Sequence, residues 1–562
     1  MNVTGRRQNL IQLIKKQPTL RVPEIADRLG VSQGTVRNDL NALAEAGQLA
    51  RVHGGAILLR DGQPHSPSFI LRAQVNEPAK LQIACRAAEQ VEDGDTILLD
   101  ASTTVYSLAR FLQDRRNLTV VTNGVEVARS LAQNPTNTVI LLGGIMRPDG
   151  TSVSGPLSDR LLQDLHIQRA FVSCTAFSLH AGLTEVDIDE AHLKRKMIGV
   201  ASSVVALIDS SKFGKVDLTP FARAEQIAAL YTDSGLDPVW IQQLRQTCMT
   251  LTVCGEQTIS TYTPCSPEAR PYRIGFANLS EQSTFAIDVR RGLERAAAAA
   301  GKIDLVLADN QLSAEVALEV AERFSNAALD LVIEYQIDAQ ASARIMDRFR
   351  QAGIPVIAVD IPVVGATYFG VDNYRAGYLA GEALGAWIRS HWEADLDHLI
   401  ILEEPRAGAQ PAARIQGQLD GLEALIGNVP AEKRMALNSG NISQVSEARM
   451  LEALAALPQA RRLAVICIND ESALGALDAA RRVGRAEDVV IVGQGADRRM
   501  RAELLRPGTR IVGSTAFFPE LYGEKVISLA LQILRGEPIP PAVYMEHVFV
   551  PAGPGTVAVA PV

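Results

Sequence analysis

Short apolar runs alternate with segments of helical periodicity through most of this chain, and that alternation limits the fold more than any other feature. In the first series, between residues 75 and 250, the expected strands are 96–99, 118–121, 138–142, 169–172 and 204–208. Apolar strands separated by helices are typical of a parallel sheet with helices on both faces. The sequence therefore predicts an α/β domain here.

A second series of the same kind begins at Tyr272. Its expected strands form two groups, the first at 273–277, 303–307, 329–333 and 355–360 and the second at 398–402, 464–468 and 489–493. Two groups predict two lobes, and the space between lobes is a frequent ligand site. The chain has 562 residues, too many for one hydrophobic core, so three or four domains are expected.

The first 60 residues follow a different pattern. One helix ends near Pro18, a short second helix spans about 23–29, and Ser32 caps a third helix at 33–46. Gly30 can adopt the left-handed backbone that stops the second helix. Two helices joined by such a tight turn form a helix-turn-helix.

Two short strands, 48–53 and 56–59, are expected to form a hairpin wing after these helices. Residues 1–60 contain nine Lys or Arg against four Asp or Glu, a balance of +5, while the whole chain has −8 and the remainder therefore −13. A basic head on an acidic body fits a reader of double-stranded DNA. The candidate DNA contacts are Arg21, Ser32, Gln33, Thr35, Arg37, Asn38, Arg51 and His53. The alternative is a small helical domain that binds protein.

The run VSQGTVRNDLNALAEAGQLARVHGGAIL resembles the N-terminal domain of DeoR-type repressors, whose pattern is VS..T.R.DL..L...G...R.HGGA. The resemblance implies a winged helix that binds an operator. Asn38 stands where that family usually has a second Arg, which implies a weaker phosphate contact or a changed base preference.

Polar or Gly-containing loops follow the first strands of the middle region, at 100–104, 122–124 and 143–144. The carboxyl ends of parallel strands are where α/β folds bind ligands, and the backbone N–H groups that begin the next helix suit a phosphate. The runs LLDASTT, VVTNG, LLGG, EAHLKRKMI and LIDSSKFG are similar to the effector domain of DeoR-type regulators. That domain is related in fold to ribose-5-phosphate isomerase and senses phosphorylated sugars.

By that resemblance, the candidate ligand residues of the middle domain are Asp100, Ser102, Thr103, Thr104, Asn123, Lys194 and Lys212. The family loop usually has Gly where Ala101 or Ser102 stands, so the phosphate cradle is altered. Two alternatives remain open: a degenerate domain kept for oligomerisation, and a sugar-phosphate isomerase with Glu190 as its base.

Residues from about 271 to 550 resemble periplasmic sugar-binding proteins and the effector domain of LacI-type repressors. The matching runs are IPVIAVD, GVDNYRAG, AARIQG, CINDESALGALDAAR, VVIVGQGAD and STAFFPELYGEKV. By that resemblance, the candidate ligand residues are Ser283, Phe285, Glu334, Asp360, Asn373, Arg414 and Asn469. Phe285 would stack on a sugar ring, and the later residues would bind hydroxyl groups.

The same region departs from the sugar binders at Ile361, at Gly493-Gln494-Gly495 and at Phe517-Phe518, where polar partners for hydroxyls are usual. A buried hydroxyl without a partner costs about 1–3 kcal/mol. A ligand with fewer hydroxyls on that side, or a sugar with an apolar substituent, is therefore expected. The alternatives are a decayed cleft that only dimerises and a cationic ligand, the latter prompted by Glu334 and Asp360.

The expected organisation is a multidomain chain: a small winged helix-turn-helix at 1–60, an α/β effector domain at 75–250 and a two-lobed α/β periplasmic-binding-protein-like domain at 271–562, with linkers at 61–74 and 251–270. No signal peptide, membrane span, P-loop, nucleophile elbow or metal-type cysteine spacing is found in the sequence, so a cytoplasmic protein without catalytic residues, metal or cofactor is expected.

These features together predict a transcriptional repressor of carbohydrate metabolism or transport genes. A sugar or sugar-phosphate-like effector would control it, and a homodimer or homotetramer would bind the operator. The alternatives are a sugar-phosphate isomerase and a DNA-binding protein whose α/β domains only oligomerise.

Overall fold

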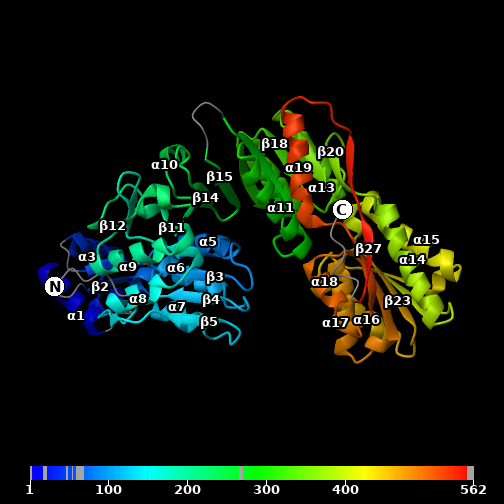
Figure 1. Cartoon of the computed structure of the whole chain (residues 1–562), viewed down its shortest axis with the longest axis horizontal. Helices are drawn as coiled ribbons and strands as arrows, with labels where there is room; N and C mark the ends of the chain where they lie inside the picture. The colour runs from blue at the N-terminus through cyan, green and yellow to red at the C-terminus, as the bar shows by residue number, and fades with distance from the viewer. Residues whose placement is uncertain are drawn as a thin grey trace. The chain divides into compact units, whose positions relative to one another are not determined.

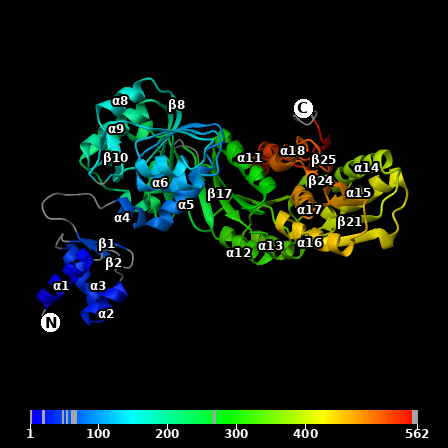
Figure 2. The same ribbon diagram turned by 90° about the horizontal axis from the view of Figure 1, so that it is seen from below.

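The computed structural model describes residues 3–16, 22–45, 49–52, 55–58, 69–148, 150–264 and 270–553. The chain divides into two compact units, Met1–Glu256 and Gln257–Val562 (Figures 1 and 2). Two predicted DNA contacts, Arg21 and His53, lie outside the described residues, as does the side chain of Arg51. None of the helices in these described ranges is long and apolar enough to cross a bilayer.

The head is a helix-turn-helix followed by a hairpin, as the sequence predicts. Its elements are α1 (Val3–Lys16), α2 (Val22–Leu29), α3 (Gln33–Glu45), β1 (Leu49–Val52) and β2 (Gly55–Leu58). The two strands pair antiparallel. Leu10, Ile25, Val36 and Leu40 are fully buried, so one apolar stripe from each helix forms the small core.

The rest of the first unit is an α/β domain. Its helices and main strands are α4 (Phe69–Gln74), α5 (Glu77–Ala88), β3 (Thr96–Leu99), α6 (Thr103–Phe111), β4 (Thr119–Thr122), α7 (Val125–Leu131), β5 (Thr138–Leu141), α8 (Pro156–Gln163), β8 (Ile167–Val172), α9 (Ile188–Gly199), β11 (Ala201–Leu207), β13 (Ala229–Asp233), α10 (Pro238–Leu244) and β14 (Thr250–Cys254). The strands run parallel in the order β14-β13-β11-β8-β3-β4-β5. Helices α5 and α6 pack on one face, and α8 and α9 on the other.

Shorter strands lie outside this parallel order. The hairpin β6 (Ile145–Met146) with β7 (Val153–Ser154) follows β5, and β9 (Ala176–Ser178), β10 (Gly182–Glu185) and β12 (Thr219–Ala222) form a small antiparallel sheet. The loops after β3, β4 and β8 emerge at the carboxyl edge of the parallel sheet, where ligands bind in α/β folds.

The second unit has two lobes, as predicted. The first lobe contains β15 (Thr258–Tyr262), β16 (Tyr272–Asn278), α11 (Thr284–Ala300), β17 (Ile303–Asp309), α12 (Ala314–Ser325), β18 (Leu331–Glu334), α13 (Ala339–Gln351), β19 (Val356–Val359), β20 (Thr367–Val371), α19 (Pro519–Leu534) and β26 (Ala542–Met545). Its strands lie in the order β26-β20-β19-β18-β16-β17-β15. Helices α11 and α19 cover one face, and α12 and α13 the other.

The second lobe repeats this plan. Its elements are α14 (Asn373–His391), β21 (His398–Glu403), α15 (Ala409–Ile426), β22 (Arg434–Asn438), α16 (Ser443–Ala456), β23 (Leu463–Cys467), α17 (Asp470–Arg482), β24 (Val489–Gly495), α18 (Arg498–Leu504), β25 (Ile511–Ala516) and β27 (Val548–Pro551). The strand order is β22-β21-β23-β24-β25-β27. Within residues 270–553 the chain crosses between the lobes three times: after β20, after β25 and after β26.

Both predicted linkers are wrong in part. Residues 69–74 of the first linker form α4, and the Phe69 ring packs against Tyr106 at 5.3 Å. The second linker, 251–270, contains most of β14, which pairs with β13, and all of β15, which pairs with β17. The Thr- and Ser-rich composition suggested a linker, but Thr, Val, Ile and Tyr also favour strands. The boundary between the two units falls after Glu256, inside the predicted linker 251–270.

Candidate functional site

The N-terminal end of α3 presents polar side chains on the surface of the head. Ser32 Oγ accepts a hydrogen bond from the Thr35 backbone N–H at 3.1 Å, so the predicted cap is present. Gln33, Arg37 and Asn38 are exposed, while the apolar residues of the same helix face the core. This is the arrangement that a recognition helix needs to reach the edges of bases in a major groove.

A charged cluster that the sequence did not reveal fixes α1 to this helix. Asp39 is buried, and its carboxylate accepts hydrogen bonds from Arg6 Nε at 2.5 Å and Arg7 Nε at 3.0 Å. Burial alone would raise the pKa of Asp39, but the hydrogen bonds from the two arginines outweigh it and lower that pKa. Asp39 therefore positions the recognition helix.

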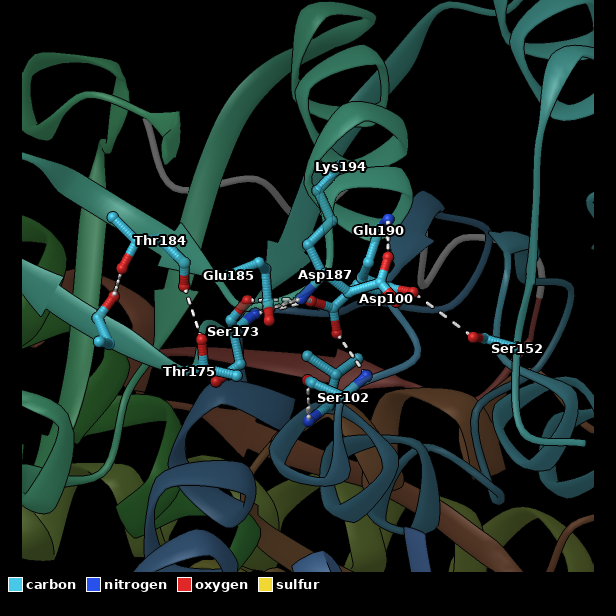
Figure 3. A network of polar contacts seen from close by, with 12 residues as sticks. Asp100, Ser102, Ser152, Ser173, Thr175, Thr184, Glu185, Asp187, Glu190 and Lys194 are labelled. Carbon is cyan, nitrogen blue, oxygen red and sulfur yellow. Dashed lines mark hydrogen bonds and ion pairs between the residues drawn. The ribbon is translucent and has the colours of Figure 1, made fainter. Parts of the chain in front are cut away.

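In the middle domain, Asp100 directly follows β3 and lies at the centre of a polar network (Figure 3). Its Oδ1 accepts from the Ser102 backbone N–H at 2.9 Å, and its Oδ2 accepts from the Ser173 backbone N–H at 2.8 Å. Lys194 extends from α9 into the same place, with its Nζ 2.9 Å from Asp100 Oδ2. Ser173, which follows β8, was not predicted from the sequence.

Lys194 makes two further polar contacts within this network. Its Nζ donates to Glu185 Oε1 at 2.6 Å and to the Ser173 carbonyl at 2.8 Å, and its side chain is 2% exposed. Burial would lower the pKa of Lys194, but the carboxylates of Asp100, Glu185 and Glu190 outweigh that effect and raise it. The sequence predicted a cation for a ligand phosphate, whereas in the structure two carboxylates already balance this charge.

The remaining predicted residues of the middle domain surround this network. Lys212 Nζ donates to Ser173 Oγ at 3.1 Å, and Ser102 Oγ caps α6 by accepting from the Val105 N–H at 3.3 Å. Thr103 and Thr104 are buried in the first turn of α6.

Asn123 is hydrogen-bonded to Glu190, whose charge acts on Lys194. Its Nδ2 lies 3.4 Å from Glu190 Oε1, and burial raises the pKa of Glu190. Within the described residues, Asn123 Oδ1 and Thr104 Oγ1 are buried without a hydrogen-bond partner. A buried polar atom left unpaired costs stability, so both atoms suit a partner from a ligand.

The second unit has a cleft that encloses about 710 Å³, part of it open to solvent. Residues of both lobes line it. Among the predicted ligand residues, those lining the cleft are Ser283, Phe285, Asp360, Arg414 and Asn469.

Two predicted ligand residues, Glu334 and Asn373, are buried but do not line the cleft. Glu334 Oε1 accepts from Asn310 Nδ2 at 3.0 Å, and burial raises the pKa of Glu334 to about 8. Asn373 Oδ1 accepts from Arg414 Nε at 3.1 Å and Nη2 at 2.7 Å, so Asn373 orients Arg414. Both residues were predicted to contact the ligand because they align with ligand-binding positions of the sugar-binding family. Such an alignment does not show in which direction a side chain points.

Arg414 is held in place by contacts with Ile468 and Phe517. Its Nη1 donates to the Ile468 carbonyl at 2.7 Å, and its guanidinium lies 4.9 Å from the centre of the Phe517 ring. Phe285 and Phe517 meet edge to face at 6.2 Å, and Ile361 also lines the cleft. Of the positions that depart from sugar binders, Ile361 and Phe517 give the cleft an apolar wall, and Gln494 lines it with a polar side chain. Gly493, Gly495 and Phe518 do not line the cleft.

Gly495 explains one of these departures. A side chain there would bring its Cβ within 3.0 Å of Asp470 Oδ2 and 3.3 Å of the Phe285 ring. The polar lining residues that were not predicted from the sequence follow the ends of strands: Tyr335, Glu404, Asn441, Asp470, Glu471 and Asp497. Their positions after β18, β21, β22, β23 and β24 were the available signal.

Family comparisons match all three parts of the chain. Residues 6–61 match the DeoR-like helix-turn-helix domain, 75–234 the DeoR C terminal sensor domain and 274–538 the periplasmic binding protein domain. The uncharacterized HTH-type transcriptional regulator YulB of Bacillus subtilis (strain 168) is 35% identical over 244 residues, which cover 43% of this chain and 94% of that relative. The chain belongs to the DeoR family.

Another DeoR-family relative is the lactose phosphotransferase system repressor of Streptococcus mutans serotype c. It is 38% identical over 235 residues, covering 42% of this chain and 93% of the relative. A solved structure similar to the second unit is a periplasmic solute binding protein of an ABC transporter from Actinobacillus succinogenes 130z with bound D-allose. It shares 19% identity and a TM-score of 0.44, covering 51% of this chain and all of that chain. This chain is thus a DNA-binding transcriptional regulator of the DeoR family that carries a periplasmic-binding-protein-like domain.

Proposed function

We propose that this DeoR-family repressor binds a double-stranded operator through α3 and the wing, and that a small molecule in the cleft of the second unit controls that binding. The observation that carries the proposal is the cleft itself, which residues of both lobes line. A ligand that contacts both lobes binds their closed arrangement more tightly than the open one, so it shifts the population between them. The head is the part that reads DNA.

The regulated genes are proposed to be those of carbohydrate metabolism or transport, and the effector a sugar-like molecule. Support comes from the name of the S. mutans repressor, a lactose phosphotransferase system repressor, and from the match to the periplasmic binding protein domain. A regulator that reads chromosomal DNA works in the compartment that holds it, so the proposal places this protein in the cytoplasm. No step in this proposal requires enzymatic activity.

The regulator is further proposed to act as a homodimer or homotetramer, because paired half-sites need two heads. Exposed apolar side chains gather around β5, β6 and α8: Leu141, Ile145, Met146, Leu157 and Leu161. We call these five residues the β5–α8 patch. Monomeric proteins rarely expose a large contiguous apolar patch, which favours a second copy of the chain as its partner.

The middle domain is a second candidate for effector binding. The unpaired Thr104 Oγ1 and Asn123 Oδ1 favour it, and Lys212 is the less buried cation at that site. The internal pairing of Lys194 favours the cleft of the second unit instead.

A direct test measures operator affinity by fluorescence anisotropy, using DNA from the region upstream of the gene and the full chain. Metabolites that raise the melting temperature of the protein are then added to the complex. We expect at least one of them to change operator affinity tenfold or more in the wild type and not in the Arg414→Ala variant. Equal operator affinity with and without every bound metabolite would contradict the proposal.

A further inference from the structure

The cleft of the second unit is strongly acidic. Five carboxyl groups line it, whereas Arg414 is the one basic side chain among its described lining residues. The carboxyl groups belong to Asp360, Glu404, Asp470, Glu471 and Asp497. Burying charge of one sign is costly unless it is paired, so the pairing of each carboxylate decides what the cleft lacks.

Three of the five carboxyl groups that line the cleft already have a cationic neighbour. Glu404 Oε2 lies 2.7 Å from Arg406 Nη2, and Glu471 accepts from Arg499 Nη1 at 3.1 Å. The positive charge of Arg414 acts on Asp360, which also accepts from the Tyr522 hydroxyl at 3.1 Å. These groups need no further cation.

Neither Asp470 nor Asp497 forms an ion pair within the described part of the chain, and the charge of Arg499, which pairs with Glu471, does not prevent the rise in the pKa of Asp497. Asp470 Oδ1 accepts from Ser514 Oγ at 2.7 Å, and its Oδ2 accepts from the Asp497 backbone N–H at 2.9 Å. The two carboxyl groups are therefore neighbours. Burial raises the pKa of Asp470 to about 8 and that of Asp497 to about 6.

Two buried oxygens on this side of the cleft have no hydrogen-bond partner. They are Asp497 Oδ2 and Gln494 Oε1, on residues that are 1% and 2% exposed and line the cleft. Both are acceptors, so the missing partner is a donor. A neutral hydroxyl could supply a hydrogen bond, but it would leave the charge of the Asp470–Asp497 pair uncompensated.

We infer that the effector carries an ammonium group that binds against Asp497 and Gln494, with the rest of the molecule on the wall formed by Phe285 and Phe517. The ligand class is a hydroxylated amine such as an amino sugar. The inference rests on the proposed function, because it describes the ligand of the same cleft. A bound metal ion is the other way to supply positive charge, but no group of three or more His, Cys, Asp or Glu in the described ranges could hold one.

The test measures binding of matched ligands to the full chain by calorimetry at pH 7.5. The probes are D-glucosamine, D-galactosamine and D-mannosamine, each compared with its neutral parent sugar and its N-acetyl derivative. We expect at least one amine to bind tenfold or more tightly than both of its neutral counterparts. A neutral counterpart that binds as tightly as its amine overturns the inference, and so does a failure of all three amines to bind.

Two variants test whether the Asp497 carboxylate is the charge that distinguishes an amine from its neutral counterparts. Asp497→Asn keeps the size of the side chain, and we expect it to reduce the preference for the amine to less than threefold. Asp395→Asn is the matched control, since Asp395 is an exposed carboxylate in the same lobe that does not line the cleft. An amine preference that survives in Asp497→Asn overturns the inference.

The failure of this inference can be told apart from failure of the proposed function. A neutral sugar that binds the cleft and changes operator affinity would support the proposed function. It would contradict the inference that the effector carries an ammonium group. If no metabolite that binds the protein changes operator affinity, the proposed function fails whatever the charge of its ligand.

Discussion

Lys194 is a lysine whose charge is balanced inside the protein. Its ammonium lies within 3 Å of the carboxylates of Asp100 and Glu185, and all three side chains are buried. Removal of one member of such a group leaves the opposite charges buried without compensation, which costs more than the intact group contributes. The network therefore stabilises the fold of the middle domain only as long as it is complete.

Replacing Lys194 with Met tests this role. We expect the free energy of unfolding of the first unit to fall by about 3–5 kcal/mol, the usual cost of breaking a buried ion pair. Urea unfolding followed by circular dichroism measures it. Lys196→Met, on the exposed side of the same helix, is the control and should change stability little. A stable Lys194→Met variant would show that the carboxylates do not need this cation.

The Asp497 carboxyl group predicts a pH dependence of stability. Burial raises its pKa to about 6, above the usual value near 3.8, so the folded chain holds its proton more firmly than the unfolded chain. The contribution of Asp497 to the free energy of unfolding therefore falls as pH rises from about 4 to above 6. The Asp497→Asn variant has no carboxyl group that could lose a proton, so it lacks this pH dependence.

We expect Asp497→Asn to unfold at higher urea than the wild type at pH 8 and to lose that advantage at pH 4.5. The gain at pH 8 should be about 1–3 kcal/mol, from the size of the pKa shift. The same Asp395→Asn control should show no such change with pH. Parallel stability curves for Asp497→Asn and the wild type would contradict the prediction.

Helix α3 combines a buried apolar side with an exposed polar side. Val36 and Leu40 face the core of the head, while Arg37 and Asn38 between them face solvent. Contacts to DNA can therefore be changed without disturbing the core. Asp39 is different, because its ion pairs with Arg6 and Arg7 fix the helix in place.

Arg37→Ala should weaken operator binding without unfolding the head. Loss of one base or phosphate contact costs about 1–3 kcal/mol, so affinity should fall about 5- to 150-fold at fixed salt. Anisotropy titrations measure it, with Arg110→Ala on the exposed side of α6 as the control. Unchanged affinity would place the DNA contact elsewhere.

Most elements could be predicted from the sequence because their apolar spacing is regular. The strands that were expected from the sequence, and the three helices of the head, appear within a few residues of their expected ends. Strands β14 and β15 could not, because their Thr-rich stretches have the composition of a linker and their partners are far away in sequence.

The candidate sites were predicted less completely. The family runs placed Ser283, Phe285 and Asp360 on the cleft, but runs of letters do not show which way a side chain points. Glu334 was therefore predicted to contact the ligand, although its carboxylate accepts a hydrogen bond from Asn310. The pairing of Lys194 with two acids likewise depends on contacts between distant segments.

At the scale of the whole molecule, the proposed oligomer depends on the β5–α8 patch. Burial of exposed leucine stabilises an interface by about 1.5–3 kcal/mol per side chain, and a buried charge there would be unfavourable. We expect the double variant Leu157→Asp, Leu161→Asp to shift the mass measured by light scattering toward the monomer. Leu218→Asp, an exposed leucine outside the patch, is the control. An unchanged mass would place the interface elsewhere.

The three crossings of the chain between the lobes of the second unit restrict how those lobes can move. Sliding or twisting one lobe would stretch the crossings unequally, whereas a bending rotation changes all three in the same sense. Under the proposed function, a ligand in the cleft would therefore change a single angle between the two lobes. The response of a single chain should then rise hyperbolically with ligand concentration, so any steeper response in the operator assay must come from coupling between chains.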